Sequence, residues 1–259
     1  MADVQALQQQ LAHARQQLAD MAAAQDAFMQ RVVHDLRAPL RHVTSYGALA
    51  QELLRELLGE LPGAGEPLDE ALDCLATMEQ SARRMALMLD GLRAIADAGR
   101  APLQPAPVDL AAALQEARAP LAASEAGRAV HWQVDADLPA VQADPPLLRQ
   151  LLRELLANAL KFTRGREPAR IAVRAQRLND SVRISVQDNG AGFEPERAGQ
   201  VFGVFERLHR ESEFEGVGAG LALCQTIAER HGARLSATAQ PGEGCTVQLD
   251  WPAAYTSPG

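Results

Sequence analysis

The chain has 259 residues, 47% of them hydrophobic and 22% charged, a composition typical of a soluble globular protein with one large or two modest domains. Its 33 acidic and 25 basic residues leave a net charge of −8, which argues against nucleic acid and anionic membranes as partners because both are negatively charged. No apolar run reaches the roughly 18 residues of a membrane span, so no membrane insertion is expected. Three widely spaced cysteines predict neither a disulfide framework nor a zinc site and favour a reduced, cytoplasmic protein.

The N-terminal part of the chain is predicted to form two long amphipathic helices. Apolar side chains recur at alternating spacings of four and three from Leu7 to Val32, a heptad pattern typical of a helix that packs against a partner helix. The glycine- and proline-rich segment 59–67 ends this helix, and a second apolar stripe runs from Leu68 to Ile95. Two such helices form an antiparallel hairpin, and two hairpins side by side form a four-helix bundle, so the pattern predicts a homodimer.

The pattern changes after the proline-rich segment 99–108, which is typical of a stiff linker. Residues 109–125 are predicted to be helical, as are residues 144–163, which open with an aspartate followed by two prolines. Segments 171–178 and 181–188 alternate between apolar and polar residues and predict two strands joined at a hairpin turn. The other expected elements are a strand over 129–135, a helix near 219–231 and strands near 233–239 and 244–251. Together they predict an α/β sandwich of about 150 residues.

Four short motifs carry residues suited to chemistry. The first, HDLRAPL at 34–40, places His34 beside Asp35 on the first predicted helix. An exposed imidazole with a carboxylate neighbour can act as a nucleophile, because the acid orients the ring and stabilises the developing charge. An ordinary solvated helix face explains these seven residues equally simply, and by themselves they favour that interpretation.

The second motif, ELLANALKFT, places Glu154, Asn158 and Lys161 on one face of a helix. A carboxylate, an amide and an ammonium group together suit a Mg²⁺–phosphate ligand, whereas the alternative is a solvated helix face. Lys161 is the only lysine among the 25 basic residues, which argues for a special role. The third motif, DNGAG, follows a predicted strand, where Asp188 can accept a hydrogen bond from an exocyclic amine such as that of adenine, although the same letters form common turns.

The fourth motif, GVGAGL at 216–221, opens a predicted helix, where successive glycine N–H groups form a site for a polyphosphate. Tight helix packing produces the same pattern, so this motif alone is weak evidence. In order and spacing, however, the four motifs resemble the phosphoacceptor, asparagine and two glycine boxes of the sensor histidine kinases, with VFGVFERLH at 201–209 similar to their phenylalanine box. RLHRESEFEG most resembles the kinase modules of the phytochrome-like branch. The resemblance covers residues 28–251.

This resemblance implies helical hairpins that form a dimeric four-helix bundle, followed by an α/β-sandwich ATP-binding domain of the Bergerat type. The implied segments are a coiled-coil signalling helix over 1–27, a dimerisation and histidine phosphotransfer domain over 28–98, a linker over 99–108 and an ATP-binding domain over 109–253. His34 would take the γ-phosphoryl group of ATP and pass it to an aspartate in the receiver domain of a response regulator. Asp35 would act as general base.

The resemblance also implies the nucleotide contacts. Asn158 would hold Mg²⁺ with Glu154 as a direct or water-mediated partner, Lys161 would contact phosphate, and Asp188 would bind the adenine amine. Segment 195–215 would form a mobile lid over ATP. The residues implied to shape the adenine pocket and cradle the phosphates are Gly190, Gly192, Gly216, Gly218, Gly220 and Leu221.

Three features depart from the family pattern. Ala38 stands where many of these kinases have threonine or asparagine, so we expect a poor phosphatase toward the phosphorylated regulator. Val217 and Ala219 replace the usual threonine and leucine or isoleucine, and loss of a hydroxyl near phosphate is expected to weaken nucleotide binding by about 1 kcal/mol. No sensory domain precedes the coiled coil, so input is expected from an upstream segment or a separate protein.

Two alternatives remain. One is an ATPase or ATP-binding module of the gyrase and MutL type without phosphotransfer, which the adjacent His34 and Asp35 argue against. The other is a coiled-coil scaffold with a vestigial ATP domain, which the retained polar and glycine positions argue against. Failure to bind ATP at millimolar concentration would favour the scaffold.

Overall fold

The computed structural model describes residues 33, 36–37, 39–56, 65–210 and 212–253. The predicted coiled coil over 1–27 and the motif residues His34, Asp35 and Ala38 lie outside the described residues. The chain divides after Ala96 into two compact units, which are described separately below. Among the described residues, no helix is both long and apolar enough to cross a membrane.

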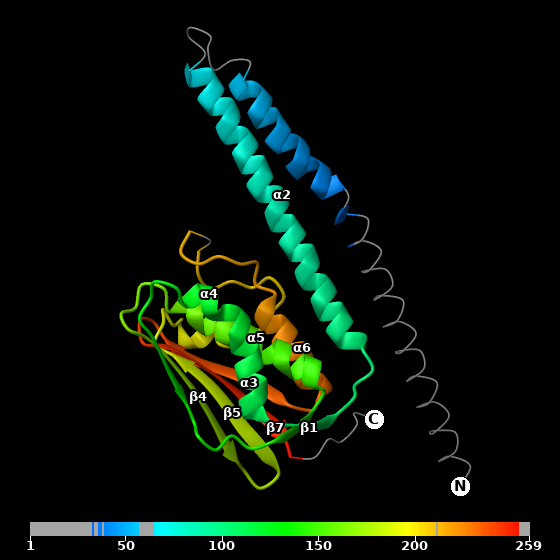
Figure 1. Cartoon of the computed structure of the whole chain (residues 1–259), viewed down its shortest axis with the longest axis vertical. Helices are drawn as coiled ribbons and strands as arrows, with labels where there is room; N and C mark the ends of the chain where they lie inside the picture. Colours follow the sequence, from blue (N-terminus) through cyan, green and yellow to red (C-terminus); the bar gives the residue numbers. More distant parts are fainter. Residues whose placement is uncertain (1–32, 34–35, 38, 57–64, 211, 254–259) are drawn as a thin grey trace, which may run out of the picture. The chain divides into compact units, whose positions relative to one another are not determined.

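The first unit is helical, as predicted. One helix covers the described residues between 36 and 56, and α2 (Gly65–Arg100) runs alongside it (Figure 1). An ion pair joins Arg37 of the first helix to Asp90 of α2, and the small side chain of Ala82 is fully buried. Of the apolar stripe that predicted the second helix, Ala82 and Leu89 are buried, whereas Met78 and Met85 are exposed.

The second unit is built on a mixed five-stranded sheet. In spatial order its strands are β2 (Val130–Val134), β4 (Ala169–Arg177), β5 (Ser181–Asp188), β7 (Gly244–Pro252) and β6 (Arg234–Gln240). β2 runs parallel to β4, whereas every other neighbouring pair is antiparallel. The predicted hairpin between β4 and β5 is confirmed, and its register pairs Arg177 with Val182 beside the turn. A second, two-stranded sheet pairs β1 (Ala106–Val108) with β3 (Val141–Ala143).

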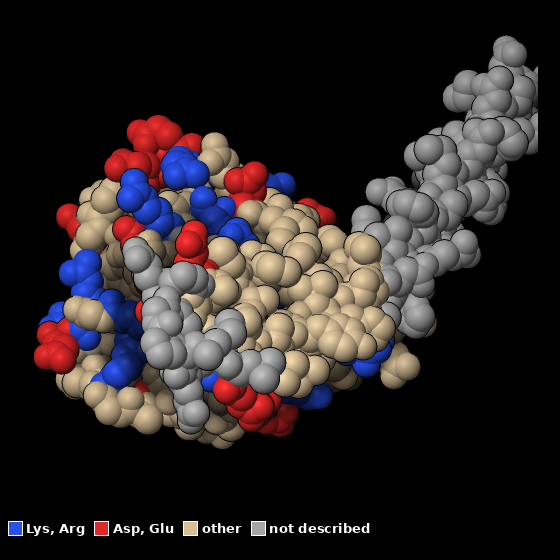
Figure 2. Space-filling model, turned by 90° about the horizontal axis from the view of Figure 1, so that it is seen from above, with Lys and Arg blue, Asp and Glu red and all other residues tan. Residues whose placement is uncertain are grey.

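Helices cover one face of the large sheet (Figure 1). They are α3 (Leu110–Arg118), α4 (Ala122–Glu125), α5 (Pro145–Phe162) and α6 (Gly220–Arg230). The helix expected over 109–125 is interrupted by a 3₁₀ turn at Ala119–Leu121, because Pro120 lacks the N–H group that a continuous α-helix needs. On the molecular face in Figure 2, basic and acidic side chains of the described residues are interspersed.

The core of the second unit is organised around α5. Asp144 caps this helix by accepting a hydrogen bond from the N–H of Leu147 (3.2 Å), and the two prolines that follow Asp144 occupy the first turn, where a missing N–H is tolerated. Eight residues of α5 are buried, seven of them leucines that face the sheet and the neighbouring helices. Since full burial of one leucine stabilises a fold by about 2 kcal/mol, this face fixes the rotation of α5 and so directs its polar face outward.

Candidate functional site

The polar face of α5 meets the glycine-rich loop that opens α6. A Cβ atom on Gly220 would lie 2.8 Å from Oε2 of Glu154 and 3.9 Å from Nδ2 of Asn158, so a glycine here lets the loop approach the helix. The structure thus brings together residues of the second and fourth motifs, which are 62 positions apart between Asn158 and Gly220.

Lys161 lies one turn further along the same face. Its Nζ atom is 3.6 Å from the Cβ position of Gly216, and 4.4 Å from the centroid of the Phe162 ring. Burial lowers the pKa of Lys161, and the nearby positive charge of Arg207 lowers that pKa further. An anion placed between Lys161 and the loop would offset both effects, because it would favour the charged form of the amine.

The loop itself adopts a backbone that favours glycine. Gly216 and Gly218 have φ values of +114° and +79°, which place both in the left-handed half of the map. The carbonyl of Gly218 accepts a hydrogen bond from the N–H of Phe205 (3.0 Å), which fixes the loop against the segment before it. Leu221 is half-buried in the first turn of α6.

Asp188 ends strand β5 and is 8% exposed. Its Oδ1 atom accepts a hydrogen bond from the N–H of Gly190 (2.8 Å), and the backbone N–H of Cys245 also bonds to the carboxyl group. Burial raises the pKa of Asp188 to about 6, although these two hydrogen bonds lower it. The group is therefore a buried acceptor with a fixed orientation, as recognition of an amine requires.

The two glycines after Asp188 permit a close approach of three backbone segments. A Cβ atom on Gly190 would lie 2.5 Å from the carbonyl oxygen of Phe162 at the end of α5, and one on Gly192 would lie 1.9 Å from that of Gln240. The N–H of Ala191 donates to the same Phe162 carbonyl at 3.0 Å. This packing joins Asp188 to the end of α5, so the second and third motifs also meet.

Sequence reasoning missed an aromatic cluster in the segment 195–215. The rings of Phe162, His209 and Phe214 contact one another with centroid separations of 5.0 to 5.4 Å. An ion pair between Arg164 and Glu215 (2.5 Å) joins the same two parts of the chain. Of the four phenylalanines between residues 193 and 214 only Phe214 belongs to this cluster, so their grouping in the sequence did not predict it.

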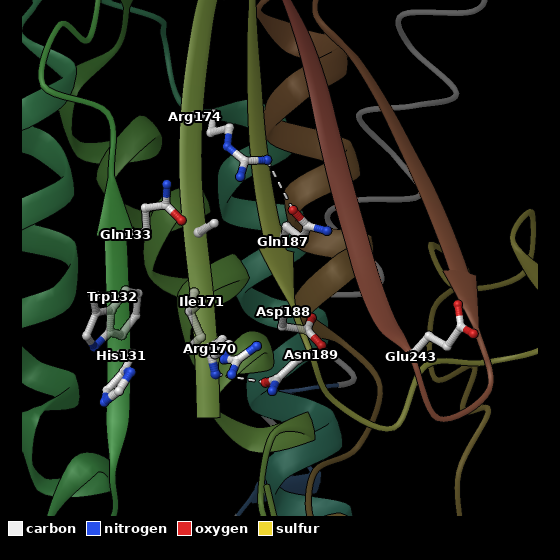
Figure 3. A pocket seen from close by; sticks show the side chains of 11 residues that line it. His131, Trp132, Gln133, Arg170, Ile171, Arg174, Gln187, Asp188, Asn189 and Glu243 are labelled. Carbon is white, nitrogen blue, oxygen red and sulfur yellow. Dashed lines mark hydrogen bonds between the residues drawn. The ribbon is translucent and has the colours of Figure 1, made fainter. Parts of the chain in front are cut away.

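An open pocket of about 370 Å³ lies against strands β2, β4 and β5 (Figure 3). Its lining includes the exposed side chains of Gln133, Arg170, Arg174 and Gln187, and Arg174 donates to Gln187 at 3.2 Å. In β4 these exposed arginines alternate with residues buried beneath the helices, so the pocket opens on the sheet face opposite α5. It also reaches Asp188 and Asn189 at the end of β5, but its lining includes no residue of the glycine-rich loop.

Known proteins resemble this chain in sequence and in fold. Residues 143–255 match the family model described as histidine kinase-, DNA gyrase B- and HSP90-like ATPase. The chain is 32% identical over 219 residues to cyanobacterial phytochrome A of Nostoc sp., covering 85% of this chain and 27% of the phytochrome. It is 32% identical over 257 residues to the adaptive-response sensory kinase SasA of Synechococcus elongatus, covering 94% of this chain and 64% of that kinase.

Among solved structures, full-length ShkA in complex with AMPPNP superposes with a TM-score of 0.60 at 25% identity. The match covers 89% of this chain and 46% of ShkA. The chain therefore spans only part of the length of each of these proteins, from about a quarter of the phytochrome to just under two thirds of the sensory kinase.

Proposed function

The chain belongs to the sensor histidine kinase family, and from this premise we propose that it is an ATP-dependent protein-histidine kinase of a two-component system. It transfers the γ-phosphoryl group of ATP to His34, and then from His34 to an aspartate in the receiver domain of a response regulator. The observation that carries the proposal is the meeting of the polar face of α5 with the glycine-rich loop, beside the buried Asp188.

Both the adenine and the phosphates of ATP find suitable groups in this arrangement. The adenine amine donates to Asp188, whose carboxyl group is already oriented by the N–H of Gly190. The phosphates lie against the N–H groups at the start of α6, where the helix dipole favours negative charge. The ammonium group of Lys161 faces the same loop at Gly216 and supplies a positive charge to the phosphates.

Magnesium fits the donor set of α5. The amide oxygen of Asn158 and the carboxylate of Glu154 are oxygen donors on one helix face, and magnesium in such sites is held by one or two protein oxygens together with phosphates and water. Bound there, the ion would neutralise charge on the phosphates. The two side chains also lie beside Gly220, which keeps the metal ligands next to the phosphate loop.

In the transfer step, a ring nitrogen of His34 attacks the γ-phosphorus. The bond from that phosphorus to the bridging oxygen breaks, and ADP leaves with the electron pair. Asp35 accepts the imidazole proton as general base and stabilises the charge on the ring. The response-regulator aspartate then takes the phosphoryl group from His34 by the same kind of displacement.

A homodimer is part of the proposal. On the helix over the described residues between 36 and 56, Val43, Tyr46, Leu49 and Leu53 recur at spacings of three and four and are 40–67% exposed. On α2, Met78 and Met85 are seven residues apart and are 55% and 46% exposed. Apolar stripes at these spacings are suited to a four-helix bundle made with a second copy. A cytoplasmic location and input from a separate or upstream sensor stay predictions.

Incubation with γ-labelled ATP and Mg²⁺ tests the function against its nearest alternative. We expect acid-labile, base-stable label on the wild-type protein and none on His34→Gln or Asn158→Ala. The two variants differ in a second readout, because only Asn158→Ala should lose nucleotide binding. ATP hydrolysis without any label on the protein would instead identify an ATPase of the gyrase type.

A further inference from the structure

Two carbonyl groups, one just before the proline-rich segment 99–108 and one within it, cannot be satisfied by a continuing helix. The partner of the Ala98 carbonyl would be the N–H of residue 102, and that of the Ala101 carbonyl would be the N–H of residue 105. Both positions are proline, which has no N–H group. The sequence therefore ends α2 and leaves these two acceptors open to another donor.

Arg230, the last residue of α6, supplies that donor. Its Nη1 atom lies 2.7 Å from the carbonyl oxygen of Ala98 and 2.6 Å from that of Ala101. This nitrogen carries two hydrogens and can donate one to each oxygen. A cation at the C-terminal end of a helix is also favoured by the helix dipole.

The rest of the segment is held to the same unit by independent contacts. The N–H of Gln104 donates to Oδ2 of Asp144 (3.0 Å), and β1 pairs with β3. Asp144 is itself fixed to the end of α6, because its N–H donates to Nε2 of the fully buried His231 at 3.0 Å. Arg230 and His231 are adjacent, so the end of α6 binds the segment directly at 98–101 and through Asp144 at 104.

One helix thus connects the nucleotide loop to this attachment. α6 begins at Gly220, beside Glu154 and Asn158, and ends at Arg230. Five of its 11 residues are buried against neighbouring elements, so the helix is fixed along its length. The N-terminal end of α6 adjoins the glycine-rich loop, and its C-terminal end binds the chain that comes from the helical unit. The helix therefore fixes the position of that chain relative to the loop.

We propose that Arg230 is a positioning residue that makes residues 98–108 move as one piece with the ATP-binding unit, so that the chain bends before Ala98 and not in the proline-rich segment. In the proposed kinase reaction, on which this second role rests, Arg230 sets how ATP is delivered to His34 without contacting the nucleotide. Loss of Arg230 then lowers the rate of phosphoryl transfer and leaves nucleotide binding unchanged.

Hydrogen–deuterium exchange of the full chain tests the attachment. We expect the amides of residues 97–104 to exchange about tenfold faster in Arg230→Gln, because hydrogen bonds to a charged group are lost. Arg234→Gln, which changes an exposed arginine of β6, is the matched control and should exchange as wild type does. Arg230→Lys, which keeps a charged donor, should restore much of the protection. Unchanged exchange at 97–104 in Arg230→Gln would overturn the attachment.

Kinetics test the positioning role separately. Arg230→Gln should reduce kcat for phosphorylation of His34 severalfold, with KM for ATP and the affinity for ATP unchanged. A raised KM, or an unchanged kcat despite faster exchange, would overturn this role. If the wild-type protein acquires no label from γ-labelled ATP, the proposed function fails. The exchange experiment then still shows whether Arg230 holds the segment 97–104.

Discussion

Gly190→Ala probes the contact that joins the proposed adenine site to the end of α5. The added Cβ would lie 2.5 Å from the carbonyl oxygen of Phe162 and 2.7 Å from Oδ1 of Asp188. An ordinary contact between carbon and oxygen is about 3.4 Å, so the backbone or the carboxyl group has to shift by nearly an ångström. Overpacking of this size costs about 1–3 kcal/mol of folding free energy.

The same shift moves the carboxyl group of Asp188, the proposed acceptor of the adenine amine. Loss of a hydrogen bond to a charged group costs about 1.5–3 kcal/mol, which corresponds to a roughly 10- to 150-fold weaker affinity for ATP. Urea unfolding and titration with a fluorescent ATP analogue measure the two effects. Gly199→Ala is the matched control, because a Cβ there meets nothing within 4 Å. Equal stability and affinity in the two variants would refute the argument.

Three further changes have distinct expected outcomes. The pKa of Asp188 is raised to about 6, so the ionised carboxylate is lost as the pH falls below that value. The affinity of the wild-type protein for adenosine should therefore drop about tenfold per pH unit below 6. In Asp188→Asn the affinity for adenosine should be weak at every pH. Burial lowers the pKa of His231, whose neutral Nε2 accepts from Asp144, so its contribution to stability is full above about pH 6.5 and is lost as the pH falls. The difference in unfolding free energy between wild type and His231→Gln should therefore be about 1–3 kcal/mol at pH 7.5 and shrink at pH 5.5; a constant difference would contradict the assignment. Lys161→Met should weaken ATP at least tenfold and leave adenosine unchanged, as isothermal titration can check.

The pattern of apolar and polar residues predicted the helices and strands that neighbouring residues in the sequence specify. The helix expected over 144–163 is α5, and its aspartate and prolines mark the first turn because capping depends on neighbouring residues alone. The strands expected over 171–178 and 181–188 differ from β4 and β5 by at most two residues at each end. The expected α/β sandwich and the helical N-terminal part are confirmed for the same reason.

Contacts between distant parts of the chain were not predictable in this way. β2 pairs with β4 in parallel, and the N–H of Asp144 bonds to His231. In neither case does the sequence around one partner identify the other. The glycines of the third motif were correctly expected to permit a close approach, but which backbone approaches Gly190 depends on the fold. The prolines at 102 and 105 did carry a signal, since they left two carbonyl groups for Arg230 to satisfy.

In the proposed reaction, the bond from the γ-phosphorus of ATP to the bridging oxygen breaks and the phosphoryl group passes to His34. Mass spectrometry under neutral conditions, after incubation with Mg²⁺ and ATP, locates the phosphoryl group on a single residue. We predict phosphohistidine at His34 in the wild-type protein and at least tenfold less of it in Gly190→Ala at limiting ATP. A phosphoryl group on another residue, or full ATP turnover with His34 unmodified, would contradict the account.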